Sequence, residues 1–345
     1  MFQWSALKKP YYVLAPMEDV TDTVFRRLVA SCARPDVFFS EFTSTDGMFS
    51  PGWSNVVHRL RFDRGEGPLI AQIWGNNPEN YLRATRRIKE LGFDGVDINM
   101  GCPVEKIIKS GSCSALIENP ALAKELYLSA KEGAGDMPVS IKTRIGFKTR
   151  VTEEWARFLL ELEPAALTVH GRTAKQLSKG SADWSEIAKV VAIRDALKID
   201  TNIIGNGDVK DLHEADRRVA ETGVDGIMIG RGIFDNLFLF DRSLPPLAER
   251  TPREKLHLLL EHVRLFHEVW QGEKPFRILK KYFKIYASHF DGASQLRMQL
   301  VETESAEEVE RLVYSFLETM TDRACSVEFS QGVMDEVEKN QASCG

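Results

Sequence analysis

Short hydrophobic runs alternate with longer amphipathic segments over the first two thirds of the chain. Several of these runs are almost continuously hydrophobic, which is typical of parallel strands that are covered on both faces. The runs that we expect to form strands are Val13–Pro16, Val37–Phe39, Leu69–Trp74, Gly95–Asn99, Val139–Arg144, Ala166–His170, Ile203–Asn206 and Gly226–Ile229.

The segments between these runs carry the signals of helix ends. Two of them begin with Asn-Pro, and Gly92 and Gly223 stand where glycine commonly ends a helix. The predicted helices are Asp22–Cys32, Pro78–Leu91, Pro120–Glu132, Thr152–Leu162, Trp184–Leu197 and Asp211–Thr222.

Strands with helices in most of the gaps predict an α/β protein, with a (β/α)8 TIM barrel over about residues 11–240. An open, doubly wound sheet is the main alternative. Such a sheet usually shows a glycine-rich fingerprint after its first strand. Here the first strand is followed by Pro16, Met17, Glu18 and Asp19, without a glycine, which favours the barrel.

The pattern changes after Pro245-Pro246, and only helical periodicity follows. We therefore divide the chain into a barrel domain (residues 1–245), a small helical domain (246–320) and a polar tail (321–345) that we expect to be poorly ordered. The helices expected in the second domain are Glu254–Gln271, Pro275–Ser288, Ala293–Val301 and Ala306–Met320.

Composition and charge exclude several classes of protein. The 345 residues carry a formal net charge of −5, which excludes a generally basic nucleic-acid binder but not a local basic patch. The five cysteines include no Cys-x-x-Cys pair, so neither a disulfide framework nor a structural zinc site is expected. No hydrophobic stretch approaches the roughly 18 residues of a membrane span. We expect a monomeric, cytoplasmic protein without a membrane segment or a structural metal.

Polar residues stand at the carboxyl ends of most of the predicted strands, where TIM barrels carry their active sites. Glycines flank Asn206, Asp208 and Arg231 at the last two strand ends. Such loops let backbone N–H groups approach a phosphate closely. Two ordinary tight turns would give the same pattern.

Three side chains at this rim suggest redox or acid–base chemistry. Lys142 lies inside a hydrophobic strand, so it must meet an anion, lose its charge or extend to the rim. His170 ends its strand and either donates to a ligand or is a satisfied core histidine. Cys102 lies between glycine and proline after a strand, on a loop that we expect to be partly exposed, and its thiol could donate a proton. Cys113 competes for that role, and a buried structural cysteine is the alternative for each.

The second domain contains one basic segment. Five cations without an intervening acid alternate with aromatic residues, and Arg297 follows. On an α-helix, Arg277, Lys281 and Lys284 would share one face. This pattern indicates a surface for nucleic-acid phosphates, although a solvated lysine-rich face would look similar. The cations are Lys274, Arg277, Lys280, Lys281 and Lys284.

In the order and spacing of its motifs, the chain resembles the tRNA-dihydrouridine synthases over about residues 11–317. In the second domain, Leu279 to Tyr282 together with Arg297 resembles the basic tRNA-facing helix of that family. The barrel motifs are Ala15-Pro16-Met17, Asn99-Met100-Gly101-Cys102-Pro103, Ile141-Lys142-Thr143-Arg144, His170-Gly171-Arg172-Thr173, Gly205-Asn206-Gly207-Asp208 and Gly230-Arg231-Gly232.

The resemblance implies an FMN-containing barrel that reduces a uridine of tRNA, with NADPH reloading the flavin. It also implies that Cys102 protonates one carbon of the uracil ring, and that Asn99, with Arg172 or Gln176, orients the flipped base. The residues implied around the flavin ring are Pro16, Met17, Glu18, Gln72, Lys142 and His170. Those implied around its phosphate are Asn206, Gly207, Asp208, Gly230 and Arg231. Those implied at the tRNA are Lys274, Arg277, Lys280, Lys281, Lys284 and Arg297.

Two departures from the family pattern leave parts of this comparison open. Glu18-Asp19 stands where small residues are usual, and the segment Gly111–Leu116 replaces a stretch that is usually richer in glycine. Two other functions also remain open. One is an FMN barrel of the dihydroorotate dehydrogenase type, which would not need the basic segment. The other is a tRNA-binding protein that no longer catalyses a reaction.

Overall fold

The computed structural model describes residues 2–320. The tail predicted over 321–345 lies outside the described residues. The chain forms two compact units, which divide between Pro245 and Pro246. Each unit is described separately below.

The first unit is a barrel of parallel strands, as the alternation of hydrophobic runs predicted. Its sheet has nine strands in the order β1-β9-β8-β7-β6-β5-β4-β2, and β3 pairs with the end of β4. Val37, just before β2, forms a parallel bridge with Val13 of β1 and thereby closes the ring. The strands are β1 Tyr11–Leu14, β2 Phe38–Phe39, β3 Thr43–Ser44, β4 Leu69–Trp74, β5 Gly95–Met100, β6 Val139–Arg144, β7 Ala166–His170, β8 Asn202–Asn206 and β9 Gly226–Ile229.

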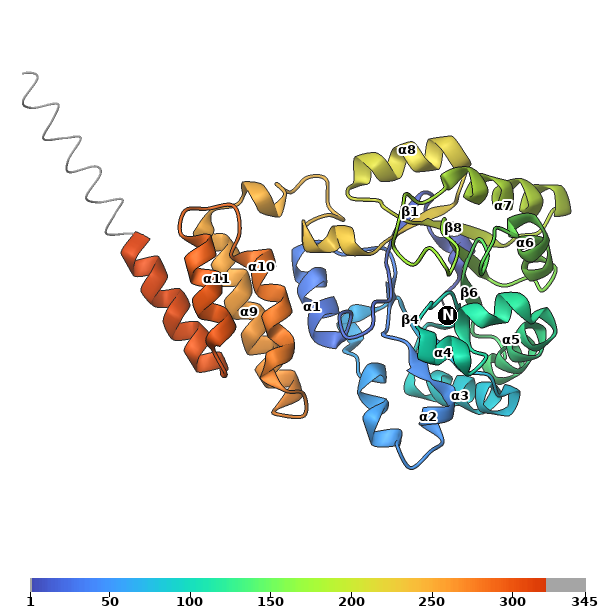
Figure 1. Ribbon diagram of the computed structural model, residues 1–345, viewed down its shortest axis with the longest axis horizontal. Helices are drawn as coiled ribbons and strands as arrows, with labels where there is room; N and C mark the ends of the chain where they lie inside the picture. Colours follow the sequence, from blue (N-terminus) through green and yellow to red (C-terminus); the bar gives the residue numbers. More distant parts are fainter. Residues whose placement is uncertain (1, 321–345) are drawn as a thin grey trace, which may run out of the picture. The chain divides into compact units, whose positions relative to one another are not determined.

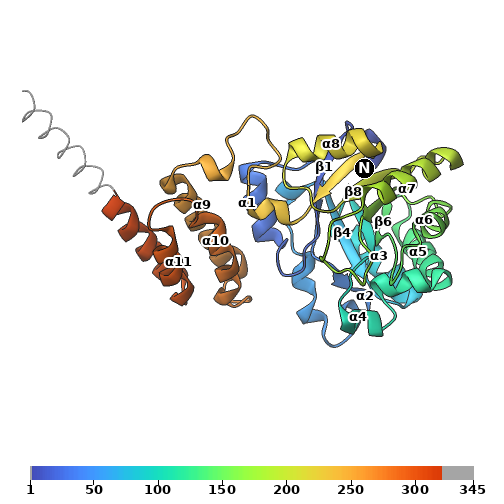
Figure 2. The same ribbon diagram turned by 45° about the horizontal axis from the view of Figure 1, so that its top comes forward.

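Helices surround these strands, and α3, α5, α6, α7 and α8 follow one another around the outside of the barrel (Figure 1). In the turned view, β4, β6 and β8 lie inside this ring (Figure 2). The open, doubly wound alternative is therefore excluded. The helices of this unit are α1 Thr23–Cys32, α2 Thr45–Met48, α3 Pro78–Leu91, α4 Glu105–Lys109, α5 Pro120–Ala134, α6 Thr152–Leu160, α7 Trp184–Leu197 and α8 Leu212–Thr222.

The helix ends follow the local signals in the sequence. The side chains of Asn77 and Asn119 accept backbone N–H groups at the starts of α3 and α5, each of which has proline in its first turn. Gly92 and Gly223 adopt left-handed backbone conformations after α3 and α8. These helices therefore begin or end where the local sequence signals predict.

The second unit is helical and has its own core. Its elements are α9 Pro252–Trp270, a 3-10 helix Phe276–Tyr282, α10 Phe283–Tyr286, α11 Ala293–Glu302 and a last helix over 306–320. Helix α10 contacts both α9 and α11. His262 of α9 shares a hydrogen bond of 2.7 Å with the hydroxyl of Tyr286.

The prediction of one α-helix over 275–288 is wrong. Leu279 and Tyr282 are buried, and Phe276 precedes them at the same spacing of three. A period of three suits a 3-10 helix, in which residues i and i+3 lie above one another. The α-helical face expected for Arg277, Lys281 and Lys284 is therefore absent, although each of the three is exposed.

Gly205 of β8 allows helix α7 to pack closely against the barrel. A Cβ atom at this position would lie 2.4 Å from the ring of Trp184, a buried residue that opens α7. Trp184 also donates from its indole nitrogen to Gly207 O at 3.1 Å, so its place helps to hold the loop after β8.

We predict that Gly205→Ala lowers the free energy of unfolding by about 1–3 kcal/mol, because the added methyl overpacks the contact with Trp184. Urea unfolding measures this change. Gly52→Ala is the matched control, since a Cβ there has its closest neighbour at 3.3 Å and the backbone φ is −83°. Equal stability of the two variants would contradict the prediction.

Candidate active site

A pocket of about 1110 Å³ opens at the carboxyl ends of the strands. Its volume is sufficient for a nucleotide-sized ligand. Ten of the residues predicted from the sequence line it, drawn from β1, β6, β7, β8, β9 and the loops that follow them. They are Pro16, Met17, Lys142, His170, Arg172, Asn206, Gly207, Asp208, Gly230 and Arg231.

Lys142 brings a positive charge to this pocket without a paired carboxylate. Its Nζ donates to the Asn206 Oδ1 at 3.2 Å, and the Asn206 amide in turn donates to Met228 O at 2.8 Å. Burial, together with the nearby charge of Arg144, lowers the pKa of Lys142 to about 8, while Asp97 and Cys102 oppose this shift. A partly buried ammonium whose hydrogen-bond partner is neutral is suited to an anionic ligand.

His170 is held in the neutral form. Burial lowers its pKa to about 2, and the charges of Lys142, Arg144 and Arg172 act in the same direction. Arg172 Nη1 lies 3.2 Å from His170 Nε2. Since a guanidinium only donates, Nε2 must accept, and the ring proton therefore resides on Nδ1. His170 can donate one hydrogen bond from Nδ1 without carrying a charge.

An ion-pair cluster shapes the loop after β8. Asp208 pairs with Arg172 at 2.5 Å and with Arg231 at 3.4 Å, and it also accepts the N–H of Ala182 at 2.8 Å. The negative charge of Asp208 is thus offset by two arginines. Arg172 is almost fully buried here, whereas the Arg231 side chain is 66% exposed.

The backbone of this loop has a conformation that favours glycine. Gly207 has a φ of +135°, and Asp208, the residue after it, has a φ of +56°. A Cβ on Gly207 would lie 2.5 Å from the Cβ of Ala182 and 3.2 Å from His170. The loop therefore packs at a distance that only glycine permits, beside the neutral histidine.

Gln72 and Asn99 do not line this pocket, and each is engaged within the protein. The Asn99 Oδ1 accepts the N–H groups of Gly101 and Cys102, both at 3.0 Å. The Asn99 amide donates to the Gln72 Oε1 at 3.0 Å, and the Gln72 amide donates to Asp97 at 2.7 Å. The structure thus places both residues in a hydrogen-bond network that supports the Cys102 loop, and the ligand contacts expected of them stay a prediction.

Asp97 and Ser140 complete this chain of hydrogen bonds and were not predicted. The Ser140 hydroxyl donates to Asp97 at 2.6 Å, and Asp97 is fully buried. Burial raises the pKa of Asp97 to about 6, and the hydrogen bonds from Ser140 and Gln72 oppose that rise. A signal was present in the sequence, because an aspartate inside the hydrophobic run Gly95–Asn99 is unusual.

Arg144 was also overlooked as a site residue. It lines the pocket and is almost fully buried. Its Nε donates to Gly101 O at 2.6 Å, and its Nη1 donates to Thr173 O and Leu177 O, both at 3.1 Å. One guanidinium thereby joins the Cys102 loop to the loop after β7. Gln176 belongs to the latter loop and accepts from Thr173 N at 2.8 Å, which shapes that loop from within.

Cys102 is more buried than predicted, with 9% of its surface exposed, and its carbonyl accepts the hydroxyl and the N–H of Ser114, the residue after Cys113. Cys113 has no exposed surface. Of the two candidate thiols, only Cys102 can reach a ligand without rearrangement.

Glu18 points to a partner outside the pocket. Its carboxylate pairs with Arg59 at 2.5 Å. Burial raises the pKa of Glu18, while the hydrogen bond from Arg59 opposes that rise. The departure at Glu18-Asp19 therefore adds an ion pair between Glu18 and Arg59, and the expected contact between Glu18 and the cofactor stays a prediction.

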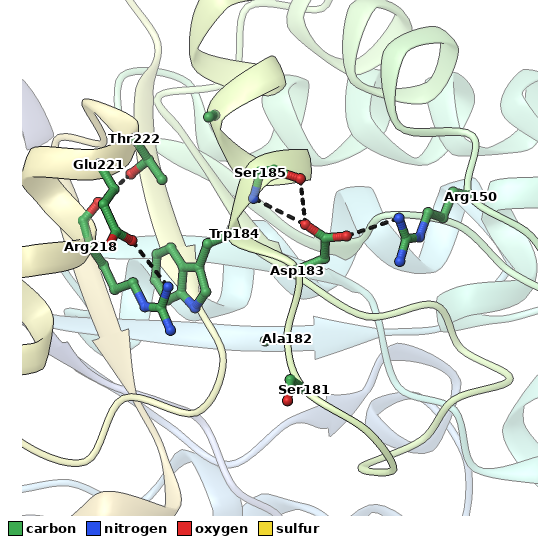
Figure 3. A pocket seen from close by; sticks show the side chains of 10 residues that line it. Arg150, Ser181, Ala182, Asp183, Trp184, Ser185, Arg218, Glu221 and Thr222 are labelled. Atoms are coloured by element: carbon green, nitrogen blue, oxygen red, sulfur yellow. Dashed lines mark hydrogen bonds and ion pairs between the residues drawn. The ribbon is translucent and has the colours of Figure 1, made fainter.

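A smaller pocket of about 500 Å³ lies between the start of α7 and helix α8. Figure 3 shows its charged residues already joined to one another: Asp183 lies between Ser185 and Arg150, and Arg218 faces Glu221. Arg218 also lies 5.2 Å from the Trp184 ring. Since these charges neutralise each other, we assign the chemistry to the larger pocket.

In the second unit, the predicted basic residues have different environments. Lys280 pairs with Glu304 at 2.7 Å, and Arg297 donates to Ala287 O at 2.5 Å. Lys274 lies 4.1 Å from the ring of Trp270. Arg277, Lys281 and Lys284 are the exposed members of the set.

Two further expectations concern metals and membranes. Within residues 2–320, no group of three or more His, Cys, Asp or Glu side chains is arranged to hold a metal ion. No helix in this described part of the chain is both long and apolar enough to cross a membrane.

Comparison with known proteins identifies close sequence relatives. The family model for dihydrouridine synthase (Dus) matches residues 13–324. "Probable tRNA-dihydrouridine synthase 2" of Bacillus subtilis (strain 168) is 44% identical over 317 residues, which are 91% of this chain and 96% of that protein. A "Probable tRNA-dihydrouridine synthase" of Staphylococcus aureus (strain N315) is 42% identical over 316 residues, with 91% and 95% coverage.

Solved structures support the fold alone. The old yellow enzyme homologue from Zymomonas mobilis superimposes with a TM-score of 0.50 at 16% identity, covering 71% of this chain and 92% of that one. Histamine dehydrogenase from Rhizobium sp. 4-9 gives a TM-score of 0.52 at 12% identity, covering 74% and 49%. These values agree with the barrel described above.

Proposed function

Because the chain belongs to the dihydrouridine synthase family, we infer that it is a flavin-dependent oxidoreductase that reduces the ring double bond of a uridine in tRNA to 5,6-dihydrouridine. The observation that carries this inference is the family match over 13–324. The pocket supports it, because a partly buried Lys142 ammonium and a neutral His170 meet there at one rim.

We propose FMN as the flavin and NADPH as the nucleotide that reloads it. FMN, when bound, supplies the hydride, and the protein supplies binding, orientation and the proton. The residues of the pocket fit such a group. Lys142 would face the anionic edge of the ring, and His170 would donate to it from Nδ1. The Gly207 and Gly230 loops, together with Arg231, would hold the phosphate.

Cys102 is proposed as the acid of the reaction. Reduction of the uracil double bond requires hydride at one ring carbon and a proton at the other. A thiol can supply that proton from a loop at the rim of the pocket. Asn99 would act by holding the backbone of this loop, and Arg172 and Gln176 would act by shaping the rim on the β7 side. These three positions were expected to orient the base directly.

The target uridine must leave its stack to enter a barrel mouth, and single-stranded loops of tRNA make this less costly than a duplex would. We propose that the second unit binds the tRNA backbone through Arg277, Lys281 and Lys284, which are exposed. Lys274, Lys280 and Arg297 would contribute less, because they are less exposed.

We predict that replacing Arg277, Lys281 and Lys284 together with alanine weakens tRNA binding by about tenfold and lowers the slope of log K against log salt by roughly 2–3, since each phosphate contact releases counterions. Filter binding at several salt concentrations measures both. The control variant replaces Arg86, Lys124 and Lys131, which are equally exposed on the barrel. Equal slopes in the two variants would argue against this surface.

The function is tested by mapping dihydrouridine in tRNA from cells with and without this protein. One position that loses the modification would identify the substrate uridine. Unchanged tRNA, together with turnover of a free pyrimidine by the purified protein, would favour the dihydroorotate dehydrogenase type. We further propose a monomer in the cytoplasm, which light scattering and cell fractionation would test.

A further inference from the structure

We propose that Asp97 is a positioning residue for the acid of the reaction: it anchors a chain of hydrogen bonds that holds the backbone of the Cys102 loop. This inference rests on the function proposed above. Asp97 lies on β5, five positions before Cys102, and it is fully buried. It is not among the residues that line the pocket, so it must act through other side chains.

The chain begins at the Cys102 loop, where its direction is fixed. The Asn99 Oδ1 accepts the N–H groups of Gly101 and Cys102, both at 3.0 Å. A backbone N–H can only donate, so the atom of Asn99 that faces the loop must be its oxygen. The amide nitrogen of Asn99 is therefore the atom that donates away from the loop.

The next two links follow the same direction. Asn99 Nδ2 donates to the Gln72 Oε1 at 3.0 Å, so the nitrogen of the Gln72 amide must point the other way. That nitrogen donates to Asp97 Oδ2 at 2.7 Å, and Gln72 and Asp97 are paired in register on β4 and β5. The chain therefore requires an acceptor at position 97.

Asp97 supplies acceptors on both of its oxygens. Its Oδ1 accepts the hydroxyl of Ser140, its register partner on β6, at 2.6 Å. Burial raises the pKa of Asp97 to about 6, which leaves the carboxylate ionised at pH 7, and an ionised carboxylate only accepts. If the Gln72 amide turned over, its oxygen would face this carboxylate and its nitrogen would face the nitrogen of Asn99. Asp97 thus holds Gln72, and through it Asn99, in one orientation.

Stability alone does not account for a carboxylate at this place. Ile70, two positions before Gln72 on β4, belongs to the hydrophobic core of the barrel together with Ala166 and Ile204. Burial of a charge in such surroundings is costly, and replacement of a buried polar network by hydrophobic side chains is often neutral or stabilising. Control of the Asn99 orientation gives Asp97 a role that a hydrophobic residue could not fill.

Two substitutions separate the acceptor from the charge. Asp97→Leu and Asp97→Asn both remove the negative charge, so any effect of that charge on Lys142 or the flavin is common to both. Asparagine keeps an oxygen for the Gln72 amide. Its nitrogen can donate to the Ser140 hydroxyl, whose proton can then turn to Val96 O, 3.4 Å away. A difference between the two variants therefore reports on the acceptor.

The first test measures the two half-reactions of the flavin-loaded protein separately. Reduction of the flavin by NADPH needs no proton from Cys102, whereas single-turnover reduction of uridine in tRNA by the pre-reduced enzyme does. We expect uridine reduction to be about tenfold slower in Asp97→Leu than in Asp97→Asn, because a buried amide without its acceptor is costly to keep in place. Flavin reduction should be equal in the two. Asp225→Leu is the control, since it removes a buried aspartate just before β9, and it should change neither half-reaction.

Hydrogen–deuterium exchange provides a measurement that does not depend on turnover. The N–H groups of Gly101 and Cys102 should exchange faster in Asp97→Leu than in Asp97→Asn, because Asn99 then holds them less firmly. Peptides that cover β9 should exchange equally in the two variants. Equal exchange of the Cys102 loop would overturn the proposal.

A third comparison places the effect at Cys102. In a Cys102→Ala background, Asp97→Leu and Asp97→Asn should reduce uridine at the same rate, because no acid remains to be positioned. A difference that persists in this background, or equal uridine reduction by the two variants when Cys102 is present, would overturn the proposal. If the wild-type protein reduces its flavin but not the uridine of tRNA, the proposed function fails and the positioning role fails with it.

Thermal unfolding verifies that Asp97→Leu is folded. If it is not, Asp97→Asn combined with Ser140→Ala takes its place in each comparison. In that double variant the asparagine nitrogen has lost its acceptor, so the asparagine oxygen is no longer directed to Gln72. The double variant should then reduce uridine more slowly than Asp97→Asn alone, and equal rates would overturn the proposal.

Discussion

Replacing Cys102 with alanine should slow dihydrouridine formation by roughly 10²- to 10⁴-fold, which is the usual contribution of a positioned acid, while flavin and tRNA remain bound. The side chain is short and almost buried, and the backbone of its loop is held by Asn99, Ser114 and Arg144. Loss of the thiol therefore removes the proton without removing the loop.

The decisive measurement is a single turnover of pre-reduced enzyme with tRNA, because it isolates the step that needs the proton. Flavin content and tRNA affinity are measured on the same preparation. Cys32→Ala is the control, since that thiol lies on helix α1. Full turnover in Cys102→Ala, with loss of turnover in Cys113→Ala, would move the acid to Cys113.

The barrel itself could be predicted from the sequence because its signals are local. Hydrophobic runs, Asn-Pro helix starts and helix-ending glycines each depend on a few neighbouring residues. The short strand β3 was missed, since Thr43-Ser44 has no hydrophobic run and pairs only with the end of β4. Helix type in the second unit was missed because residues three apart lie on one side of an α-helix as well as of a 3-10 helix, so the spacing of Phe276, Leu279 and Tyr282 is compatible with both.

The sequence predicted which residues lie at one rim of the barrel. It did not predict which side chains form hydrogen bonds or ion pairs with one another. Partners such as Glu18 and Arg59 are 41 positions apart, and Arg172 and Asp208 are 36 apart. The hydrogen bonds that occupy Gln72 likewise come from other strands. A strand end indicates that a side chain is near the rim, but its direction depends on such distant partners.

Substitutions at Lys142 can separate the effect of its positive charge from the effect of its hydrogen bond to Asn206. We predict that Lys142→Met weakens FMN binding at pH 7 by roughly 10- to 100-fold, because a hydrogen bond to a charged group typically contributes about 1.5–3 kcal/mol. Lys142→Gln should lose nearly as much, although its amide can still donate to Asn206 Oδ1. Lys124→Met, on the exposed face of α5, is the control.

The pKa of Lys142 determines the direction in which the affinity for FMN changes with pH. With its pKa near 8 before the ligand binds, Lys142 is protonated below that pH and neutral above it. An anionic ligand binds the protonated form better, so the affinity of the wild-type protein for FMN should be highest below pH 8 and should fall as pH rises through 8. Neither Lys142 variant should show this fall.

Fluorescence titration of the apoprotein with FMN measures the affinity at each pH. A wild-type affinity that does not fall through this range, or a Lys142→Met variant that binds as tightly as wild type at pH 7, would show that the anion is held elsewhere, and Arg231 would then be the cation to test.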